Sequence, residues 1–224
     1  MNIKENISKL RDEISAHCAK IGRNESEITV VAASKYVGAE GIAEAYSAGI
    51  KDFGENRIQD AEEKMARLEG DITWHMIGHL QSNKAAKAVG AFDLIHSVDS
   101  EKLAMRIDRL AGERGIVQSI LLEVNVADED SKYGLTPPRA RELFAKVFPL
   151  ENINLLGLMT MAPLTDDESL IRGTFRGLRE LQDHIQSDLG IIIPIVSMGM
   201  TNDWRIALEE GATHLRIGSA IFRG

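Results

Sequence analysis

The sequence has few of the features that mark membrane, nucleic-acid-binding and disulfide-rich proteins. Cys18 is its single cysteine, which excludes an internal disulfide framework and fits a reducing compartment. No apolar run reaches the roughly 18 residues that a membrane-spanning helix needs. Acidic residues outnumber basic ones, 34 to 26, and the basic residues form no cluster, which argues against binding to nucleic acid or an anionic membrane. These absences predict a soluble, cytoplasmic protein.

The composition is that of an ordinary globular protein. Of the 224 residues, 44% are hydrophobic and 27% are charged, values that differ from those of disordered chains. The length exceeds a typical domain of about 150 residues and fits one large domain or two small ones. No low-complexity segment and no linker rich in proline, glycine or serine divides the chain. We therefore predict a single domain over residues 1–224.

Short apolar runs alternate with segments of helical periodicity. The eight candidate strands are Ile28–Lys35, Asp52–Glu55, Thr73–Ile77, Phe92–Val98, Ser119–Val126, Asn154–Met161, Ile192–Met198 and His214–Ile217. The candidate helices between them are Glu40–Ala48, Arg57–Leu68, Ser100–Ala111, Pro138–Phe148, Asp166–Asp188 and Asn202–Glu210. This alternation indicates a parallel sheet with right-handed crossovers. Eight strands favour an α/β fold closed into a (β/α)8 TIM barrel, with an open doubly wound sheet as the alternative.

The two ends of the chain depart from a standard barrel. The segment after the eighth strand is too short for an eighth helix. In contrast, Ile3–Ile21 precedes the first strand and carries Ile7, Leu10, Ile14 and Cys18 along one stripe, which is typical of an amphipathic helix. We expect this extra N-terminal helix to cover the gap between strands eight and one.

Lys35 ends the first predicted strand, at the barrel end where such folds hold their chemistry. The strand period of two places Val31 and Ala33 on the face of Lys35, and these small residues leave space beside it. An amine partly withdrawn from water can form a Schiff base with an aldehyde. The structural alternative is a lysine that extends its amine into solvent from a strand end.

A polar loop follows the seventh predicted strand. Ser197 and Thr201 offer hydroxyl groups, Gly199 allows a close approach of the backbone, and the following helix start offers free N–H groups. Together these groups predict an anion cradle, at a place where barrels often bind phosphate. The alternative is ordinary capping of the helix by Thr201 or Asn202.

The eighth predicted strand places Arg216 on the same face as His214 and Gly218, and Ser219 follows. A buried guanidinium needs an anion or another acceptor. The structural alternative is a pair with Glu55, Glu123 or Asp203. His75 and His79 are not predicted to bind metal, because they lack an HExxH context.

A lysine on strand one, an anion cradle after strand seven and an inward arginine on strand eight together describe a pyridoxal phosphate site. Six blocks, in this order, resemble the pyridoxal phosphate homeostasis proteins. They are Ala33-Ser34-Lys35, Phe53-Gly54-Glu55-Asn56, the segment from His75 to Lys84, Gly157-Leu158-Met159-Thr160-Met161, Ser197-Met198-Gly199-Met200-Thr201 and the segment from Arg216 to Phe222. The similarity extends from the leading helix to the last residue.

The resemblance implies a fold-type III barrel, similar to the N-terminal domain of alanine racemase, with pyridoxal 5′-phosphate held as a Schiff base on Lys35. It also implies a set of residues around the cofactor. Those that would hold the phosphate are Ser197, Gly199, Thr201, Gly218 and Ser219. Those that would lie near the ring are Arg216, at the pyridine nitrogen, and Asn56, His79 and Met159.

The same resemblance implies a role in vitamin B6 homeostasis and, indirectly, in the balance of amino acids and keto acids. It makes enzymes that need the cofactor the expected recipients, and we expect a monomer or weak homodimer. A cationic Arg216 near the pyridine nitrogen would weaken the ring as an electron sink, which suits storage better than catalysis. Two alternatives stay open: a pyridoxal phosphate-dependent amino-acid racemase, and a Schiff-base aldolase whose substrate phosphate occupies the cradle.

Overall fold

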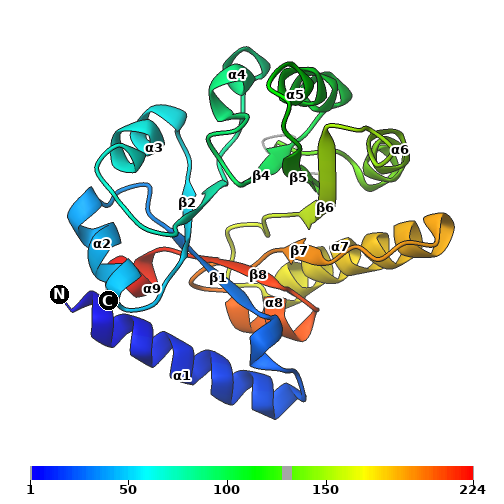
Figure 1. Cartoon of the computed structure of the whole chain (residues 1–224). Helices are drawn as coiled ribbons and strands as arrows, with labels where there is room; N and C mark the ends of the chain where they lie inside the picture. Colours follow the sequence, from blue (N-terminus) through cyan, green and yellow to red (C-terminus); the bar gives the residue numbers. More distant parts are fainter. Residues whose placement is uncertain (1, 128–132, 224) are drawn as a thin grey trace.

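The eight strands close into a parallel barrel (Figure 1). The computed structural model describes residues 2–127 and 133–223. Each strand pairs with the next one along the chain, and β8 pairs with β1, for example through Val31 opposite Arg216. The predicted closed barrel is thereby confirmed, and the open doubly wound sheet is wrong, because β1 bonds to both β2 and β8.

The barrel strands alternate with helices on the outside. The strands are β1 (Thr29–Ala33), β2 (Asp52–Glu55), β3 (Thr73–Met76), β4 (Leu94–Val98), β5 (Gln118–Glu123), β6 (Ile153–Met159), β7 (Ile195–Ser197) and β8 (His214–Ile217). The α-helices are α1 (Ile3–Ile21), α2 (Ala39–Ser47), α3 (Ile58–Met65), α4 (Ala85–Ala88), α5 (Glu101–Glu113), α6 (Pro137–Val147), α7 (Glu168–Leu189), α8 (Trp204–Glu209) and α9 (Ser219–Phe222). Two 3-10 turns, η1 (Glu25–Glu27) and η2 (Ser82–Lys84), complete the described elements. Within the described ranges, no helix is long and apolar enough to cross a membrane.

The predicted elements are present, with small shifts at their ends. β2, β8 and α1 have their predicted bounds. Three helical pieces were not predicted: η1 before β1, η2 with α4 after β3, and α9 after β8. The helix after β8, α9, has only four residues, which is a single turn and not a full eighth helix. Such short turns bury too few side chains to show a helical period in the sequence.

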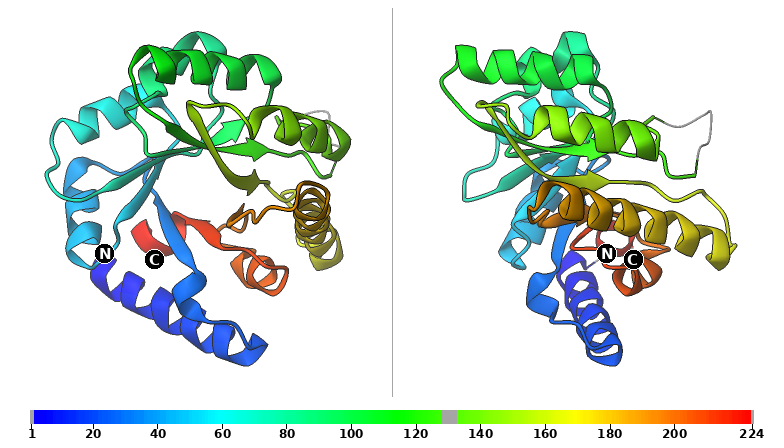
Figure 2. Two further views of the ribbon diagram at one scale, coloured as in Figure 1. Left: turned by 45° about the vertical axis from the view of Figure 1, so that its right-hand side comes forward. Right: turned by 90° about the vertical axis from the view of Figure 1, so that its right-hand side faces the viewer.

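Helix α1 covers the outside of the barrel where β8 meets β1 (Figures 1 and 2). It packs against α2, α8 and α9, and its stripe of Ile7, Leu10, Ile14 and Cys18 is buried, as predicted. Asn6 Nδ2 donates to the carbonyl oxygen of Ile221 at 3.0 Å. The leading helix therefore takes the place that a full eighth helix would occupy after β8.

The barrel has an apolar outer layer and a largely polar interior. Strand residues that face the helices, such as Phe53 and Leu215, belong to the main hydrophobic core. The interior holds a small separate apolar cluster made of Leu94, Leu121, Met159 and Ile195. Beside this cluster lie the buried side chains of His75, His96 and Arg216. Polar groups inside a barrel need hydrogen-bond partners there, and the resulting hydrogen bonds fix the positions of these side chains.

A buried ion pair fixes the end of β1 next to Lys35. Nζ of Lys64, on α3, donates to Glu55 Oε1 at 2.6 Å and to the carbonyl oxygen of Ser34 at 2.9 Å. The Ser34 hydroxyl donates to the same Glu55 oxygen at 2.5 Å. Glu55 is fully buried. Ser34, which precedes Lys35, is therefore hydrogen-bonded to β2 through its side chain and to α3 through its carbonyl oxygen.

We expect Lys64→Met to destabilise the fold by about 3–5 kcal/mol, because it leaves the Glu55 carboxylate buried without a counter-charge. Adding Glu55→Gln should restore most of the lost free energy of unfolding. The exposed pair of Lys87 and Glu62, 3.2 Å apart, provides the control: Lys87→Met should cost less than about 1 kcal/mol. Urea denaturation measures all three changes. Equal costs for Lys64→Met and Lys87→Met would contradict the role of the buried pair.

Candidate functional site

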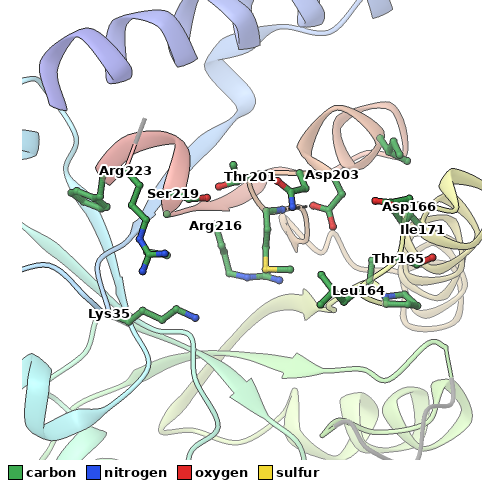
Figure 3. A pocket seen from close by; sticks show the side chains of 18 of the residues that line it. Lys35, Leu164, Thr165, Asp166, Ile171, Thr201, Asp203, Arg216, Ser219 and Arg223 are labelled. Atoms are coloured by element: carbon green, nitrogen blue, oxygen red, sulfur yellow. Dashed lines mark hydrogen bonds between the residues drawn. The ribbon is translucent and has the colours of Figure 1, made fainter. Parts of the chain in front are cut away.

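A pocket of about 720 Å³ opens at the carboxyl ends of β1, β7 and β8 (Figure 3). Its volume is in the range of small-molecule sites. The segments that line it are the end of β1 with residues 35–37, residues 162–166 after β6, residues 200–203 after β7, and parts of α7, α8, β8 and α9. The pocket therefore lies at the barrel end where the sequence predicts the chemistry.

Five of the ten predicted site residues line this pocket. They are Lys35, Thr201, Arg216, Gly218 and Ser219. The other five lie outside its lining. They are Asn56, His79, Met159, Ser197 and Gly199. The structure thus brings together the lysine, the arginine and part of the predicted cradle.

Lys35 extends from the end of β1 into the pocket, below Arg223 (Figure 3). Its Nζ lies 5.3 Å from the centroid of the Tyr36 ring, and the Arg223 guanidinium lies 5.4 Å from the same ring. With Arg216, three cations line the pocket, and the carboxylates of Asp166, Glu168 and Asp203 line it as well. Lys35 and Arg223 lie on one side of the pocket and Asp166 lies on the other. This separation of charge favours an anionic group beside Lys35.

The loop after β7 and the start of α9 are the two segments in which the sequence predicts an anion cradle. Thr201 Oγ1 accepts a hydrogen bond from the N–H of Ala220 at 3.5 Å, which joins the two segments. Among the described residues, the backbone N–H groups of Thr201 and Ser219 have no acceptor. Gly199 has a φ of +92°, and a Cβ there would lie 2.6 Å from Ala207 Cβ. The cradle thus offers hydroxyl and N–H donors on a tightly constrained loop.

Arg216 is buried at the base of the pocket. Its Nη1 donates to Ser197 Oγ at 2.6 Å and its Nη2 donates to the carbonyl oxygen of Thr160 at 2.8 Å. Burial lowers the pKa of Arg216 to about 10, and the charges of Glu123 and Asp203 oppose this shift. The side chain therefore stays cationic at neutral pH. Among the described residues, no carboxylate lies within ion-pair distance of it, so hydrogen bonds to neutral oxygens hold it.

Ser197 has a different environment from the one the sequence suggests. Its Oγ lies 2.9 Å from His96 Nδ1, in addition to its bond from Arg216, and the residue is fully buried. These contacts direct the hydroxyl into the barrel, although the residue was predicted to face the phosphate. Thr201, four residues on, reaches the pocket instead.

The predicted ring neighbours lie deeper in the barrel or to one side. Met159 is fully buried in the interior apolar cluster. His79 Nδ1 lies 3.2 Å from Asp99 Oδ2, and its imidazole stacks on Tyr133 with centroids 3.7 Å apart. Asn56 follows β2, and its backbone passes so close to Gly78 that a Cβ there would lie 2.4 Å from the Asn56 carbonyl oxygen.

The sequence did not point to three further residues that lie near the site. His96 and Asp99 come from β4 and the loop after it, and Thr160 contributes only its carbonyl oxygen to Arg216. A main-chain contact leaves no signal in residue type. His96 lies at an inward-facing position of its strand, and this alternation is the signal in the sequence that indicates it.

The chain is similar to known proteins in both sequence and fold. Residues 2–224 match the family described as alanine racemase, N-terminal domain. The chain is 42% identical to the pyridoxal phosphate homeostasis protein of Aquifex aeolicus, over 99% of this chain and 98% of that protein. It is 37% identical to the structure of PipY from Synechococcus elongatus with PLP bound, with a TM-score of 0.87 and coverage of 98% and 99%. Alanine racemase of Clostridium difficile is 13% identical, with a TM-score of 0.79 over 99% of this chain and 59% of that one, which shows a shared fold.

The Glu123 carboxyl gives a pH-dependent prediction. Burial raises its pKa to about 7, with a further rise from Asp99 and an opposing effect of Arg216. The folded protein therefore keeps this proton at pH values where the unfolded chain has lost it. The resulting stability is fully present below the unfolded pKa and is lost as the pH rises through about 7.

We expect Glu123→Gln to remove this loss of stability at rising pH. Relative to the unsubstituted protein, the variant should gain about 2–3 kcal/mol of unfolding free energy between roughly pH 5 and 8. Denaturant titrations at the two pH values measure the difference, with the exposed Glu151→Gln as the control. A gain no larger than that of the control would show that Glu123 ionises freely in the folded protein.

Proposed function

This chain belongs to the pyridoxal phosphate homeostasis proteins, within the alanine racemase N-terminal domain family, and on that premise we propose that it binds pyridoxal 5′-phosphate covalently through Lys35. Its role would be to hold the cofactor and pass it to enzymes that need it, with indirect effects on amino-acid and keto-acid balance. One observation carries the proposal: an amine, a set of anion-binding donors and a buried guanidinium face one pocket.

The residues of the pocket fit the chemical groups of this cofactor. The hydroxyls of Thr201 and Ser219 and their unpaired N–H groups suit a phosphate dianion. Gly218 lets the chain after β8 pass close to β1, since a Cβ there would lie 3.2 Å from the Ala33 carbonyl oxygen. The Arg216 guanidinium has N–H groups that can face a pyridine nitrogen. When bound, the cofactor supplies an aldehyde carbon that an amine can attack.

Lys35 would hold the ligand by condensing with this carbon, with release of one water. The hydrogen bonds of Ser34 with Glu55 and Lys64 fix the strand end from which the amine of Lys35 extends. Arg216 would donate a hydrogen bond to the ring nitrogen and keep a proton off it, because a cation disfavours a second positive charge nearby. A ring without that proton stabilises a carbanion poorly. These properties favour retention of the cofactor over catalysis.

We expect Lys35→Ala to abolish the visible absorption band that appears when the protein is mixed with pyridoxal phosphate, while unfolding stays cooperative. Borohydride reduction should attach the ligand to the peptide that contains Lys35. Lys51→Ala, which removes an exposed lysine at the opposite end of the barrel, should leave both results unchanged. A reduced ligand found on another lysine, such as Lys64 or Lys84, would refute the assignment.

The racemase alternative requires a second acid–base group on the opposite face of the ring. The two candidates are His79, which lies outside the pocket lining, and Tyr36, which lines the pocket but is largely exposed to solvent. We therefore expect the loaded protein to show negligible exchange of the α-hydrogen of L-alanine in deuterated water over minutes. Turnover near the enzyme median of about 10 per second, abolished by Tyr36→Phe or by His79→Gln, would favour the racemase over the carrier.

A further inference from the structure

A continuous series of hydrogen-bonded side chains runs through the barrel from the start of β2 to Arg216. Asp52 Oδ1 lies 3.0 Å from His75 Nε2, and His75 Nδ1 lies 2.9 Å from His96 Nε2. His96 Nδ1 lies 2.9 Å from Ser197 Oγ, which accepts from Arg216 Nη1 at 2.6 Å. We call these five residues the interior column. They come from five strands, β2, β3, β4, β7 and β8.

The middle of the interior column is sealed from water. His75 is 2% exposed, and His96 and Ser197 are fully buried. Asp52, at the amino end of β2, keeps 29% of its side chain exposed and lines a surface cleft with Thr29 and Lys51. The column therefore has one end at a solvated carboxylate and the other at the ligand pocket.

The charge states of the histidines limit how protons are ordered along the column. Burial, with smaller effects of the neighbouring His75, Arg216 and His214, lowers the pKa of His96 well below its usual value. Burial also lowers the pKa of His214, whose ring lies 6.4 Å from His75 and 6.5 Å from His96, to about 4. His96 is therefore neutral at physiological pH, with one ring nitrogen that donates and one that accepts.

The proposed direction of the hydrogen bonds starts at Asp52. Its carboxylate oxygen accepts from His75 Nε2, and in this order His75 Nδ1 accepts from His96 Nε2. His96 Nδ1 is left as an acceptor and receives the hydroxyl hydrogen of Ser197. The lone pairs of Ser197 then face Arg216, which suits a donor that carries a positive charge.

We propose that His96 is a positioning residue for Arg216, acting through Ser197 and oriented by His75 and Asp52. This inference rests on the proposed function, in which the Arg216 guanidinium faces the pyridine nitrogen of the ligand. The column would fix the guanidinium in the orientation that recognises that nitrogen. The barrel interior thereby contributes to ligand specificity from residues that do not touch the ligand.

Two substitutions of His96 separate its two hydrogen bonds. In His96→Asn the side-chain amide keeps a polar atom near the position of Nδ1, facing Ser197. In His96→Gln the amide reaches the position of Nε2, facing His75, and no polar atom faces Ser197. The exposed His184→Gln variant is the control. All variants are first compared by urea denaturation, so that loss of the fold is recognised.

The ligand probes are pyridoxal phosphate and its 1-deaza analogue, in which carbon replaces the ring nitrogen. The unsubstituted protein and His184→Gln should bind pyridoxal phosphate at least about tenfold more tightly than the analogue, the value of one charge-assisted hydrogen bond. His96→Asn should keep most of this ratio, and His96→Gln should reduce it to about twofold or less. An undiminished ratio in a folded His96→Gln protein would overturn the proposal.

A second measurement needs no ligand. In the ligand-free protein, ¹⁵N spectra of the histidine rings should show His96 protonated at Nε2 and unprotonated at Nδ1. Asp52→Asn should weaken this preference, because an amide can donate as well as accept. A proton on Nδ1 of His96 in the unsubstituted protein would also overturn the proposal. If the unsubstituted protein binds no pyridoxal phosphate, the proposed function fails. If it binds pyridoxal phosphate and His96→Gln leaves the affinity ratio unchanged, only the role of the interior column is refuted.

Discussion

The buried charge of Arg216 is the constraint around which the barrel interior is arranged. A guanidinium taken out of water must be hydrogen-bonded, or the fold loses several kcal/mol. Here the acceptors are neutral oxygens of Ser197 and Thr160, from strand β7 and the end of β6. Glu123 and Asp203 lie near enough to affect its pKa without forming an ion pair. The guanidinium therefore keeps N–H groups that no carboxylate occupies.

Two lysines lie near the end of β1, and one of them forms a buried ion pair while the other lines the pocket. Lys64 approaches from α3, outside the barrel, and its charge is neutralised by Glu55. Lys35 extends into the pocket, where its Nζ lies 5.3 Å from the centroid of the Tyr36 ring and, among the described residues, forms no ion pair with a carboxylate. One lysine holds the strand end in place, and the other keeps an amine available for a ligand.

The sequence predicted the fold well because its signals are periodic and long. The stripe on α1 and the inward period of β8 required only the spacing of residues, and both were found in the structure. Short turns such as α4 and α9 carry too few residues for that signal. The period of a strand gives the face of a residue but not its depth in a closed barrel, so Ser197 and Thr201 could not be distinguished. The partner of Ser197, His96, lies 101 residues away in the chain, and no local pattern connects them.

A crystal structure of the protein soaked with pyridoxal phosphate would show directly whether the ligand binds covalently at Lys35. We expect continuous electron density from Lys35 Nζ to the ligand, with the phosphate against Thr201 and Ser219 and the ring nitrogen facing Arg216. Density attached to another lysine would contradict this expectation. So would a phosphate bound away from Thr201 and Ser219, or a ring nitrogen that faces away from Arg216.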